Sequence, residues 1–568
     1  MTSASRRTLP DIVTVGQYLA HRLLEVGGPH VFGLPGDFNL TLLDEMLTVE
    51  GVEWVGNTNE LNAAYAADAY ARTSRGVAAL VTTYGVGELS AINGIAGSFA
   101  EDVPVVQITG MPTSAARTAG ALSHHTLVDG DYDHFVRAYR EVTVASAVLR
   151  PADASRDIDR VLRAALDESK PVYLGIPMDV AAAPVSSAPL RHPLRPSPSD
   201  AVALADFATA LTDVLAGQER VTVLAGPRIH RRRAEHLLER IADHPGVRVA
   251  TQASAKSMLP ETHPASLGIY LGQMTPSETT RRAIDEAPVV ILAGTVLSDV
   301  LTGFYSQGFD LHAGVELGIL QARVGQVTFH DVRLEDSLRI VDEVVSGLDL
   351  GPVPVTEETW PFRAPLPARV AGSALTQREL WTTVQEWLPV DTIAIADAGT
   401  AMYGALELQM PRGTDLLASP IWSSIGYTLP ATLGTSLASE RRSVLFIGDG
   451  AAQLTAQELA TILHRGLAPI VVLINNDGYT IERVIQSPAA VYQGITRWNW
   501  SALPAALAPG VPVLTSQVTT VEELRAALEA ASAATDRLVL IEAHLDPNDA
   551  PPLLAALGRL AGGAAESE

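Results

Sequence analysis

Residues 443–450 read SVLFIGDG, and residues 469–478 read PIVVLINNDG. Each stretch opens with an apolar run that is typical of a buried strand in a parallel sheet, and each ends in small and polar residues. A helix-like stretch from about Leu454 to Arg465 separates the two runs. This order predicts a βαβ unit, and ligands of such open sheets bind at the carboxyl ends of the strands.

Two oxygen-bearing side chains are predicted to meet at that edge of the sheet. Asp449 follows the first run between two glycines, and Asn476 follows the second run. Taken singly, Gly-Asp-Gly is typical of a tight turn and Asn-Asn of a helix cap. Carboxylate and amide oxygens suit Mg²⁺, and the N-terminus of the following helix favours an anion. Together the two stretches predict a site for magnesium and a phosphate group.

Three blocks of alternating apolar runs and helix-like stretches make up the chain. They predict an α/β fold of three doubly wound domains with mainly parallel sheets. We expect the domains at residues 1–185, 199–350 and 368–568, separated by Pro-rich linkers at Ala181–Ser199 and Gly351–Pro367. The predicted strands are His30–Pro35, Val52–Thr58, Val77–Tyr84, Val103–Gly110, Val221–Pro227, Val289–Asp299, Thr392–Ala396 and Arg537–Ala543, and one predicted helix is Asn59–Thr73.

Composition excludes several classes of protein. The 568 residues include 47% hydrophobic and 18% charged residues, which is enough apolar material for several cores, and the formal net charge is -24. So acidic a surface repels phosphate backbones and anionic lipid, so nucleic acid and membranes are poor partners. The absence of cysteine removes disulfides and thiolate chemistry. Without a signal peptide pattern or a long apolar run, we expect a cytoplasmic protein.

The Gly448-Asp449-Gly450 and Asn475-Asn476 pair resembles the diphosphate-binding signature of thiamin-diphosphate enzymes. Over nearly its whole length the chain resembles the pyruvate/indolepyruvate decarboxylase family. The resemblance implies thiamin diphosphate and Mg²⁺ as cofactors. It also implies a pyrimidine-binding, a central Rossmann-like and a diphosphate-binding domain. Asp449, Asn476 and the carbonyl of Gly478 would hold the metal.

The same family implies a proton-transfer set that is spread over the chain. Its motifs here are VFGLPGDFNLTLLD at Val31–Asp44, NTNELNAAYAADAYAR at Asn57–Arg72, a tandem histidine, and DGYTIERVI at Asp477–Ile485. Each of these residues could instead have a purely structural role. A glutamate at the start of a helix often only interacts with the helix dipole, and two adjacent histidines are often ordinary loop residues. By resemblance the catalytic residues are Asp37, Glu60, His124, His125 and Glu482, and Glu60 would share a proton with the pyrimidine ring.

The resemblance also implies the residues around the cofactor. Ile425, in WSSIGYTLPA at Trp422–Ala431, would wedge between the two cofactor rings, whereas Ser423 departs from the usual glycine. The expected cofactor-binding residues are Glu60, Gly399, Thr400, Ser423, Ile425, Gly448, Asp449, Gly450, Ala451, Asn476, Gly478, Tyr479, Thr480 and Ile481.

The substrate is the least determined feature. Family position suggests a pocket lined by Ala398, Met402, Tyr403, Ile481 and Ile485. In DAGTAMYGA at Asp397–Ala405, Ala398 replaces a glutamine and opens volume. Ile481 and Ile485 instead match the narrow pyruvate pattern. We expect non-oxidative decarboxylation of an aromatic or branched-chain 2-oxo acid, such as indolepyruvate or phenylpyruvate, through a covalent thiamin diphosphate intermediate, with pyruvate as the runner-up.

Two other functions fit parts of this pattern. A thiamin-dependent carboligase would keep the Asp449 and Asn476 module without needing the whole proton-transfer set. A catalytically decayed scaffold would fit the departures at Ala398 and Ser423.

The family also implies a homodimer or homotetramer whose active sites lie at the subunit interface, with a small-molecule 2-oxo acid as the partner.

Overall fold

The structure is a computed structural model that describes residues 9–352, 362, 364, 366 and 372–565. The chain divides into two compact units, residues 1–197 and 198–568. Most of the predicted linker Gly351–Pro367 lies outside the described residues. Within the described ranges, no helix combines the length and the apolar character needed to cross a membrane.

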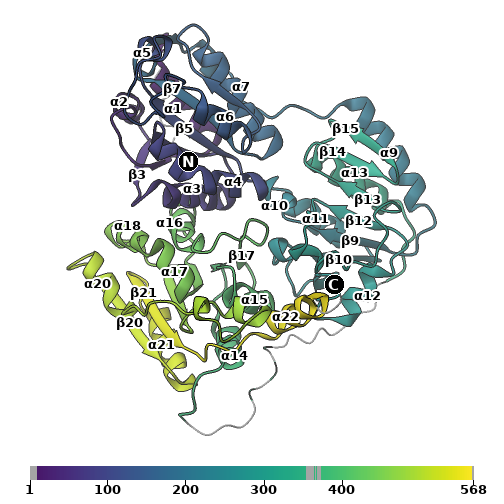
Figure 1. Cartoon of the computed structure of the whole chain (residues 1–568). Coiled ribbons are helices and arrows are strands. Elements are labelled where there is room, and N and C mark those ends of the chain that lie inside the picture. The colour runs from purple at the N-terminus through teal and green to yellow at the C-terminus, as the bar shows by residue number, and fades with distance from the viewer. Residues whose placement is uncertain (1–8, 353–361, 363, 365, 367–371, 566–568) are drawn as a thin grey trace. The chain divides into compact units, whose positions relative to one another are not determined.

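A parallel sheet forms the centre of the first unit (Figure 1). Its described strands follow the order β3-β2-β4-β5-β7-β6, and each neighbouring pair is parallel. The strands are β2 (His30–Gly33), β3 (Glu53–Gly56), β4 (Ala78–Thr83), β5 (Val105–Met111), β6 (Ser146–Val148) and β7 (Val172–Pro177). The predicted strands of this block are confirmed, whereas β6 and β7 were not predicted.

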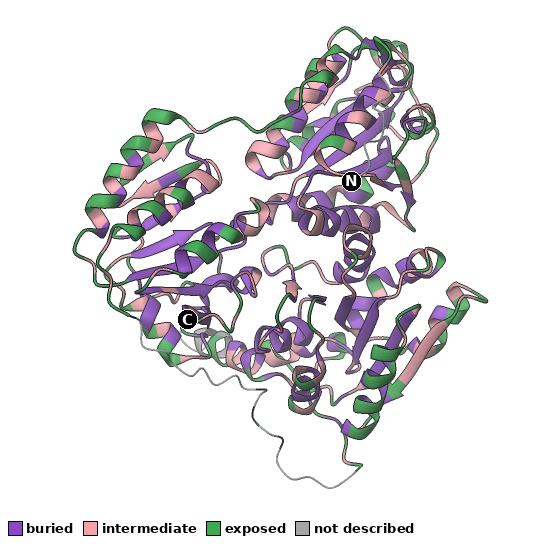
Figure 2. Cartoon of the chain, turned by 180° about the vertical axis from the view of Figure 1, so that it is seen from behind, coloured by how far each residue is buried: buried purple, intermediate pink, exposed green. Residues whose placement is uncertain are grey.

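Helices cover both faces of this sheet. On one face, α1 (Val15–Val26), α2 (Leu40–Leu47) and α7 (Ala154–Glu168) share an apolar core with the strands. On the other, α3 (Glu60–Ser74) packs against α4 (Val86–Ala100). The central strands β4, β5 and β7 are buried throughout (Figure 2). Each fully buried Val, Leu or Ile contributes about 1.5–3 kcal/mol, so the sheet is the main source of this unit's stability.

The first predicted linker is partly wrong. Pro184–Ser186 forms strand β8, which pairs antiparallel with β1 (Ile12–Thr14), and a 3₁₀ turn follows at Ala188–Arg191. Val185 is buried and belongs to the core of the unit. The Pro/Ala/Ser composition therefore concealed a short edge strand, and regular structure is absent only over 192–200.

Two sheets make up the described part of the second unit. The first has the order β11-β10-β9-β12-β13-β14-β15, and it is parallel as far as β13 and antiparallel beyond. Its strands are β9 (Val221–Ala225), β10 (Val247–Thr251), β11 (Ser266–Ile269), β12 (Val290–Ala293), β13 (Val315–Leu317), β14 (Gln321–Val324) and β15 (Val327–His330). Helices α9 (Ala201–Leu215), α11 (Glu235–Ala242) and α13 (Leu334–Ser346) cover one face, and α12 (Glu278–Asp285) covers the other.

The second sheet of this unit is parallel and has the order β17-β16-β18-β19-β21-β20. Its strands are β16 (Ile393–Ala396), β17 (Asp415–Leu417), β18 (Ser443–Gly448), β19 (Ile470–Asn475), β20 (Val513–Val518) and β21 (Leu538–His544). The helices around it include α14 (Gln377–Trp387), α15 (Thr400–Leu406), α16 (Thr428–Ala438), α19 (Thr480–Ile485), α21 (Val521–Ala533) and α22 (Pro552–Ala565). The mainly parallel, doubly wound α/β class is thus confirmed.

The helix predicted at Leu454–Arg465 begins earlier than expected. Helix α17 (Asp449–Thr455) starts directly after β18, and a 3₁₀ turn at Ala456–Glu458 separates it from α18 (Leu459–His464). Of the Gly-Asp-Gly stretch, Gly448 ends β18, and Asp449 and Gly450 are the first residues of α17. Asp449 therefore lies at a helix N-terminus, where backbone N–H groups favour negative charge.

Candidate active site

In the first unit, the predicted catalytic residues lie along the carboxyl edge of the parallel sheet. Asp37 is in the turn after β2, and Glu60 is the first residue of the helix after β3. His124 and His125 are in the loop that follows β5 and α5 (Ser114–Thr118). Strand order places β2 beside β3 and β4, so residues far apart in the sequence reach one edge.

Asp37 and the two histidines form a close group. Asp37 Oδ2 lies 2.7 Å from His124 Nε2, and Asp37 Oδ1 lies 4.0 Å from His125 Nε2. His125 has a left-handed backbone with φ of 62°, which turns both rings to one side, with their centroids 4.6 Å apart. The sequence named these three residues separately, and the fold brings them together.

Gly85 explains how this turn is held. A Cβ on Gly85 would lie 2.0 Å from the His125 carbonyl oxygen, and Gly85 itself has φ of 65°. Only glycine permits so close an approach in that conformation. The end of β4 therefore supports the histidine loop directly.

Glu60 is half-buried at the start of α3. Asn59 caps this helix by accepting a 2.8 Å hydrogen bond from the Asn62 N–H. The Glu60 carboxylate lies beside Gly87, since a Cβ there would stand 3.2 Å from Glu60 Oε1. The contact with this glycine was not predicted from the sequence.

Glu88 is a buried residue of this region that sequence reasoning missed. Its carboxylate accepts hydrogen bonds from the Gly85 N–H at 2.8 Å and from the Tyr173 hydroxyl at 2.9 Å. Burial raises the pKa of Glu88 to about 7, against the opposing effect of these hydrogen bonds. Its spacing of three residues from Gly85 is that of a capping box, which is the signal that could have found it. Glu88 fixes the Gly85 turn and, through it, the histidine loop.

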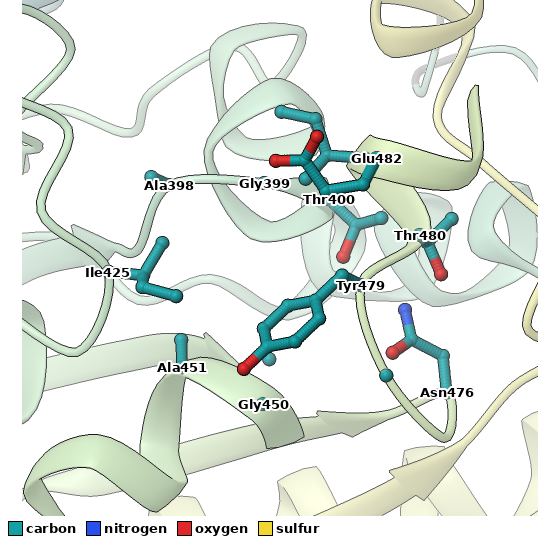
Figure 3. A pocket seen from close by; sticks show the side chains of 13 residues that line it. Ala398, Gly399, Thr400, Ile425, Gly450, Ala451, Asn476, Tyr479, Thr480 and Glu482 are labelled. Atoms are coloured by element: carbon teal, nitrogen blue, oxygen red, sulfur yellow. The ribbon is translucent and has the colours of Figure 1, made fainter. Parts of the chain in front are cut away.

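The second unit contains a cavity of about 280 Å³ at the carboxyl edge of its last sheet. Figure 3 shows the side chains of Ile425, Tyr479 and Glu482 around this space. Its lining residues come from the loops after β16, β17, β18 and β19: Ala398, Gly399, Thr400, Ile425, Gly448, Gly450, Ala451, Asn476, Gly478, Tyr479, Thr480, Ile481 and Glu482. Nearly all of them were singled out from the sequence.

Three oxygen atoms converge beside this cavity. The Asn476 amide oxygen lies 2.9 Å from the Gly478 carbonyl oxygen and 3.1 Å from Asp449 Oδ1. With the amide rotated, its nitrogen would donate to both oxygens. The Asn476 amide therefore lies between these two oxygens, and with its own oxygen turned inward the three oxygens could surround a cation. Burial also raises the pKa of Asp449 to about 7, and a bound cation would offset that cost of burying a charge.

Ile425 is held by a buried carboxylate that received no role from the sequence. Asp397, at the end of β16, accepts hydrogen bonds from the Gly426 N–H at 3.2 Å and from the Thr428 hydroxyl at 2.6 Å. On the other side, Gly426 is so close to α17 that a Cβ would lie 2.8 Å from the Ala451 carbonyl oxygen. Burial raises the pKa of Asp397 to about 6. The Ile425 loop is therefore clamped between two strand ends.

The other predicted residues fall into different environments. Met402 and Tyr403 are buried in the apolar core of the second unit, and Ile485 is 38% exposed. Ser423 has a left-handed φ of 52°, the conformation that favours the glycine expected there. Its hydroxyl donates to the Pro420 carbonyl at 3.0 Å. Among these predicted pocket residues, Ala398 and Ile481 line the cavity.

Family models and known proteins are similar to this chain in sequence. Family models described as the N-terminal, central and C-terminal domains of thiamine pyrophosphate enzymes match residues 13–131, 208–341 and 397–543. Proteins named alpha-keto-acid decarboxylase are similar over 96% of the chain. The protein from Mycolicibacterium paratuberculosis is 43% identical across 96% of its own length, and that from Mycobacterium tuberculosis is 42% identical across 97%. The chain belongs to the thiamin-diphosphate-dependent 2-oxo acid decarboxylases.

The residues at the cavity fit the cofactor of this family. The converging oxygens of Asp449, Asn476 and Gly478 suit Mg²⁺. The N-terminus of α17 lies at the same strand end, and its N–H groups suit a phosphate. Gly450 leaves room for the Tyr479 ring, since a Cβ there would lie 2.6 Å from that ring. The second unit thus presents a donor set for a magnesium diphosphate.

Arg483 supports the loop that carries Asn476 and Gly478. Its guanidinium donates to the carbonyl oxygens of Asn476 at 3.2 Å and Asp477 at 3.0 Å. It also donates to the carbonyls of Gln493 at 3.1 Å and Pro547 at 3.2 Å. One side chain thereby fixes the turn that carries the Asn476 and Gly478 oxygens. Its sequence position, next to Glu482 on a short helix, gave no sign of this role.

We expect Arg483→Met to weaken Mg²⁺ binding by about 10- to 100-fold, the usual range for a residue that positions ligands without touching the metal. The methionine fills similar space but leaves the carbonyls without their donor. Calorimetric titration of Mg²⁺ with thiamin diphosphate into the apoprotein measures the effect. Arg497→Met is the matched control, since Arg497 pairs with the exposed Asp477 side chain at 2.5 Å and makes no described contact with these carbonyls. Equal affinities for the two variants would contradict the role of Arg483.

Proposed function

We propose that this decarboxylase converts an aromatic or branched-chain 2-oxo acid, such as indolepyruvate or phenylpyruvate, into an aldehyde and CO₂. The observation that carries the proposal is the pairing of two sets of residues. The second unit has the converging oxygens of Asp449, Asn476 and Gly478 beside a cavity. The first has Asp37 hydrogen-bonded to His124 at 2.7 Å, which is a group able to move protons.

Cofactor activation falls to Glu60 and Ile425. When bound, thiamin diphosphate would supply a nucleophilic carbon and take up the electron pair that the broken C–C bond leaves behind when CO₂ departs. Glu60 would hold a proton at its carboxyl group and could exchange it with the pyrimidine ring of the bound cofactor. Ile425, fixed through Asp397 and Gly426, would support the cofactor rings. Asp449, Asn476 and Gly478 would hold Mg²⁺, whose charge would neutralise the diphosphate.

Proton transfer to the product falls to Asp37, His124, His125 and Glu482. Glu482 lines the cavity at the start of α19. His124 Nε2, bonded to Asp37, would deliver or receive a proton, since an imidazole nitrogen can both donate and accept one. The apolar lining from Ala398, Ile425 and Ile481 excludes water around the leaving carboxylate.

Assembly completes this proposal. The two sets of residues belong to different compact units, and we assign each active site to a subunit interface of a homodimer or homotetramer. The domain boundaries 1–185, 199–350 and 368–568 belong to the same proposal; the three larger sheets of the described residues fall within them, whereas strand β8 extends one residue past 185.

Substrate preference rests on the short side chain at 398. Ala398 lines the cavity beside Ile481, and it leaves volume that the longer glutamine of the family pattern would fill. The test is a comparison of kcat/KM for pyruvate, phenylpyruvate, indolepyruvate and branched 2-oxo acids, with thiamin diphosphate and Mg²⁺ present. Higher values for the aromatic or branched acids support the proposal. A clear preference for pyruvate would replace it with the pyruvate decarboxylase alternative.

We expect Ala398→Leu to lower kcat/KM for phenylpyruvate relative to pyruvate by about 10- to 200-fold, because apolar pockets discriminate on that scale per added methylene or methyl. The added side chain occupies the volume that a large substrate needs. Ala405→Ser, on the far end of the neighbouring helix α15 and outside the cavity lining, is the control and should leave the ratio unchanged. A ratio in the leucine variant equal to that of the wild type would remove Ala398 from the substrate pocket.

A further inference from the structure

The side chains of Asp37, His124 and His125 have the composition of a metal site as well as of a proton relay. Among the described residues, these three form a group whose ligand atoms all lie within 4.8 Å of one another. They supply two imidazole nitrogens and one carboxylate oxygen. Three protein ligands with a fourth position open to water or substrate is the usual composition of an exchangeable zinc site.

The distances fit a tetrahedral ion. With metal–ligand bonds of about 2.0–2.2 Å, neighbouring ligand atoms stand about 3.3–3.5 Å apart. Asp37 Oδ2 lies 2.7 Å from His124 Nε2 and Asp37 Oδ1 lies 4.0 Å from His125 Nε2, so a different carboxylate oxygen faces each ring. One ligand atom from each residue lies within 4.8 Å of the other two, and side-chain rotations would bring these atoms to the tetrahedral spacing. We propose that Asp37, His124 and His125 together bind Zn²⁺, or a divalent transition metal of similar chemistry. The ion would take the place of the protons that these side chains otherwise share.

Packing around the triad holds its members in place before any ion binds. The Phe38 ring stacks on His124 with centroids 4.9 Å apart and meets His125 edge-on at 6.0 Å. The buried Asn39 accepts from the Gly36 N–H at 2.9 Å and donates to the Leu34 carbonyl at 2.9 Å, which fixes the Asp37 turn. The left-handed His125 is held against Gly85. Little further ordering is needed on binding, which favours affinity.

Ligand chemistry separates this site from the proposed magnesium site. Asp449, Asn476 and Gly478 offer only oxygens, which suit Mg²⁺, whereas two imidazoles favour Zn²⁺, Cu²⁺ or Ni²⁺ over Mg²⁺. Magnesium in excess would therefore fill the first site and leave the triad to zinc. In the first unit the side chains are accessible, with exposures of 48%, 61% and 32% for Asp37, His124 and His125.

Zinc at the triad has a consequence for catalysis, and this part rests on the proposed function. The imidazole nitrogens that coordinate the ion can no longer accept or deliver protons. Zinc would then inhibit turnover reversibly without displacing thiamin diphosphate. Metal binding itself does not depend on the reaction, so the two parts can be tested separately.

The binding test is calorimetric titration of Zn²⁺ into the tag-free, full-length holoenzyme in excess Mg²⁺. We expect one equivalent per chain to bind, and His124→Gln and His125→Gln each to weaken that equivalent at least about tenfold. His244→Gln is the matched control, because His244 makes a similar pair with Asp342 at 2.8 Å, and among the described residues this pair is not part of a group of three possible metal ligands. Zinc affinity that is unchanged in the His124 and His125 variants, or lost equally in the His244 variant, would overturn the site.

Activity is then measured at the zinc concentration that fills this equivalent. We expect CO₂ release to fall at least tenfold and to recover on addition of a zinc chelator, while thiamin diphosphate stays bound. A bound equivalent with full activity would overturn the inhibitory role. An enzyme inactive on every 2-oxo acid in zinc-free buffer would instead overturn the proposed function, and the binding result would still decide on the metal site.

Discussion

Replacing Glu60 by glutamine is expected to lower turnover of every 2-oxo acid at least about 100-fold, the smallest usual contribution of a positioned acid–base group. Glutamine keeps the size and the hydrogen-bonding reach of the side chain but has no proton to exchange with the pyrimidine ring. Binding of Mg²⁺ should be unchanged, since its proposed ligands belong to the other unit. CO₂ release at saturating substrate and calorimetric Mg²⁺ titration measure the two effects.

Glu53→Gln is the matched control for this experiment. Glu53 is on the neighbouring strand β3, is 62% exposed, and lies 3.5 Å from His30. An exposed pair of this kind contributes little, so the variant should behave as the wild type does. Activity of Glu60→Gln within about threefold of that of the Glu53→Gln control would remove Glu60 from its assigned role.

Asp449→Asn should abolish the rise in melting temperature that Mg²⁺ with thiamin diphosphate causes. The carboxylate is one of three converging oxygens and is the charged one, so its loss should weaken Mg²⁺ binding by at least about 100-fold, beyond what positioning residues contribute. A ligand that binds only the folded state raises the melting temperature. The rise in Tm on adding Mg²⁺ with thiamin diphosphate should appear in the wild type and vanish in the variant.

The control for Asp449 lies in the same loop region. Asp477→Asn neutralises a carboxylate that is 38% exposed and paired with Arg497. We expect its Tm response to match that of the wild type. A full Mg²⁺-dependent rise in Tm for Asp449→Asn would refute the assignment of this side chain as a metal ligand.

The sequence predicted the strand ends best because their chemistry is local. The apolar runs before Asp449 and Asn476 end where β18 and β19 end, and parallel neighbours must bring those ends to one edge. The short strands β8, β17 and β20 were missed because they are partly exposed and carry weak patterns. Strand β7 was also missed although it is buried throughout. The doubly wound class survives these omissions because most of the other central strands of the sheets were predicted.

Residues that act through tertiary contacts could not be predicted in this way. Asp397 accepts a hydrogen bond from Gly426, which is 29 residues away. Glu88 accepts one from Tyr173 in another strand, and Arg483 donates to Pro547 in a separate turn. Nor does an apolar helix distinguish a pocket from a core, so Met402 and Tyr403 were assigned to the substrate pocket although they lie in the core cluster of their unit. These limits explain why the sequence determines the residues expected around the substrate less well than those expected at the strand ends.

Analysis of the products formed from a single substrate tests whether the protein decarboxylates a 2-oxo acid to an aldehyde. The full-length protein is incubated with phenylpyruvate, thiamin diphosphate and Mg²⁺, and CO₂, aldehyde and hydroxyketone are measured together. For a 2-oxo acid decarboxylase we expect one aldehyde for each CO₂ released, with little hydroxyketone. Hydroxyketone in place of aldehyde would identify a carboligase, and an absence of CO₂ from phenylpyruvate and from the other 2-oxo acids alike would identify a scaffold without this activity.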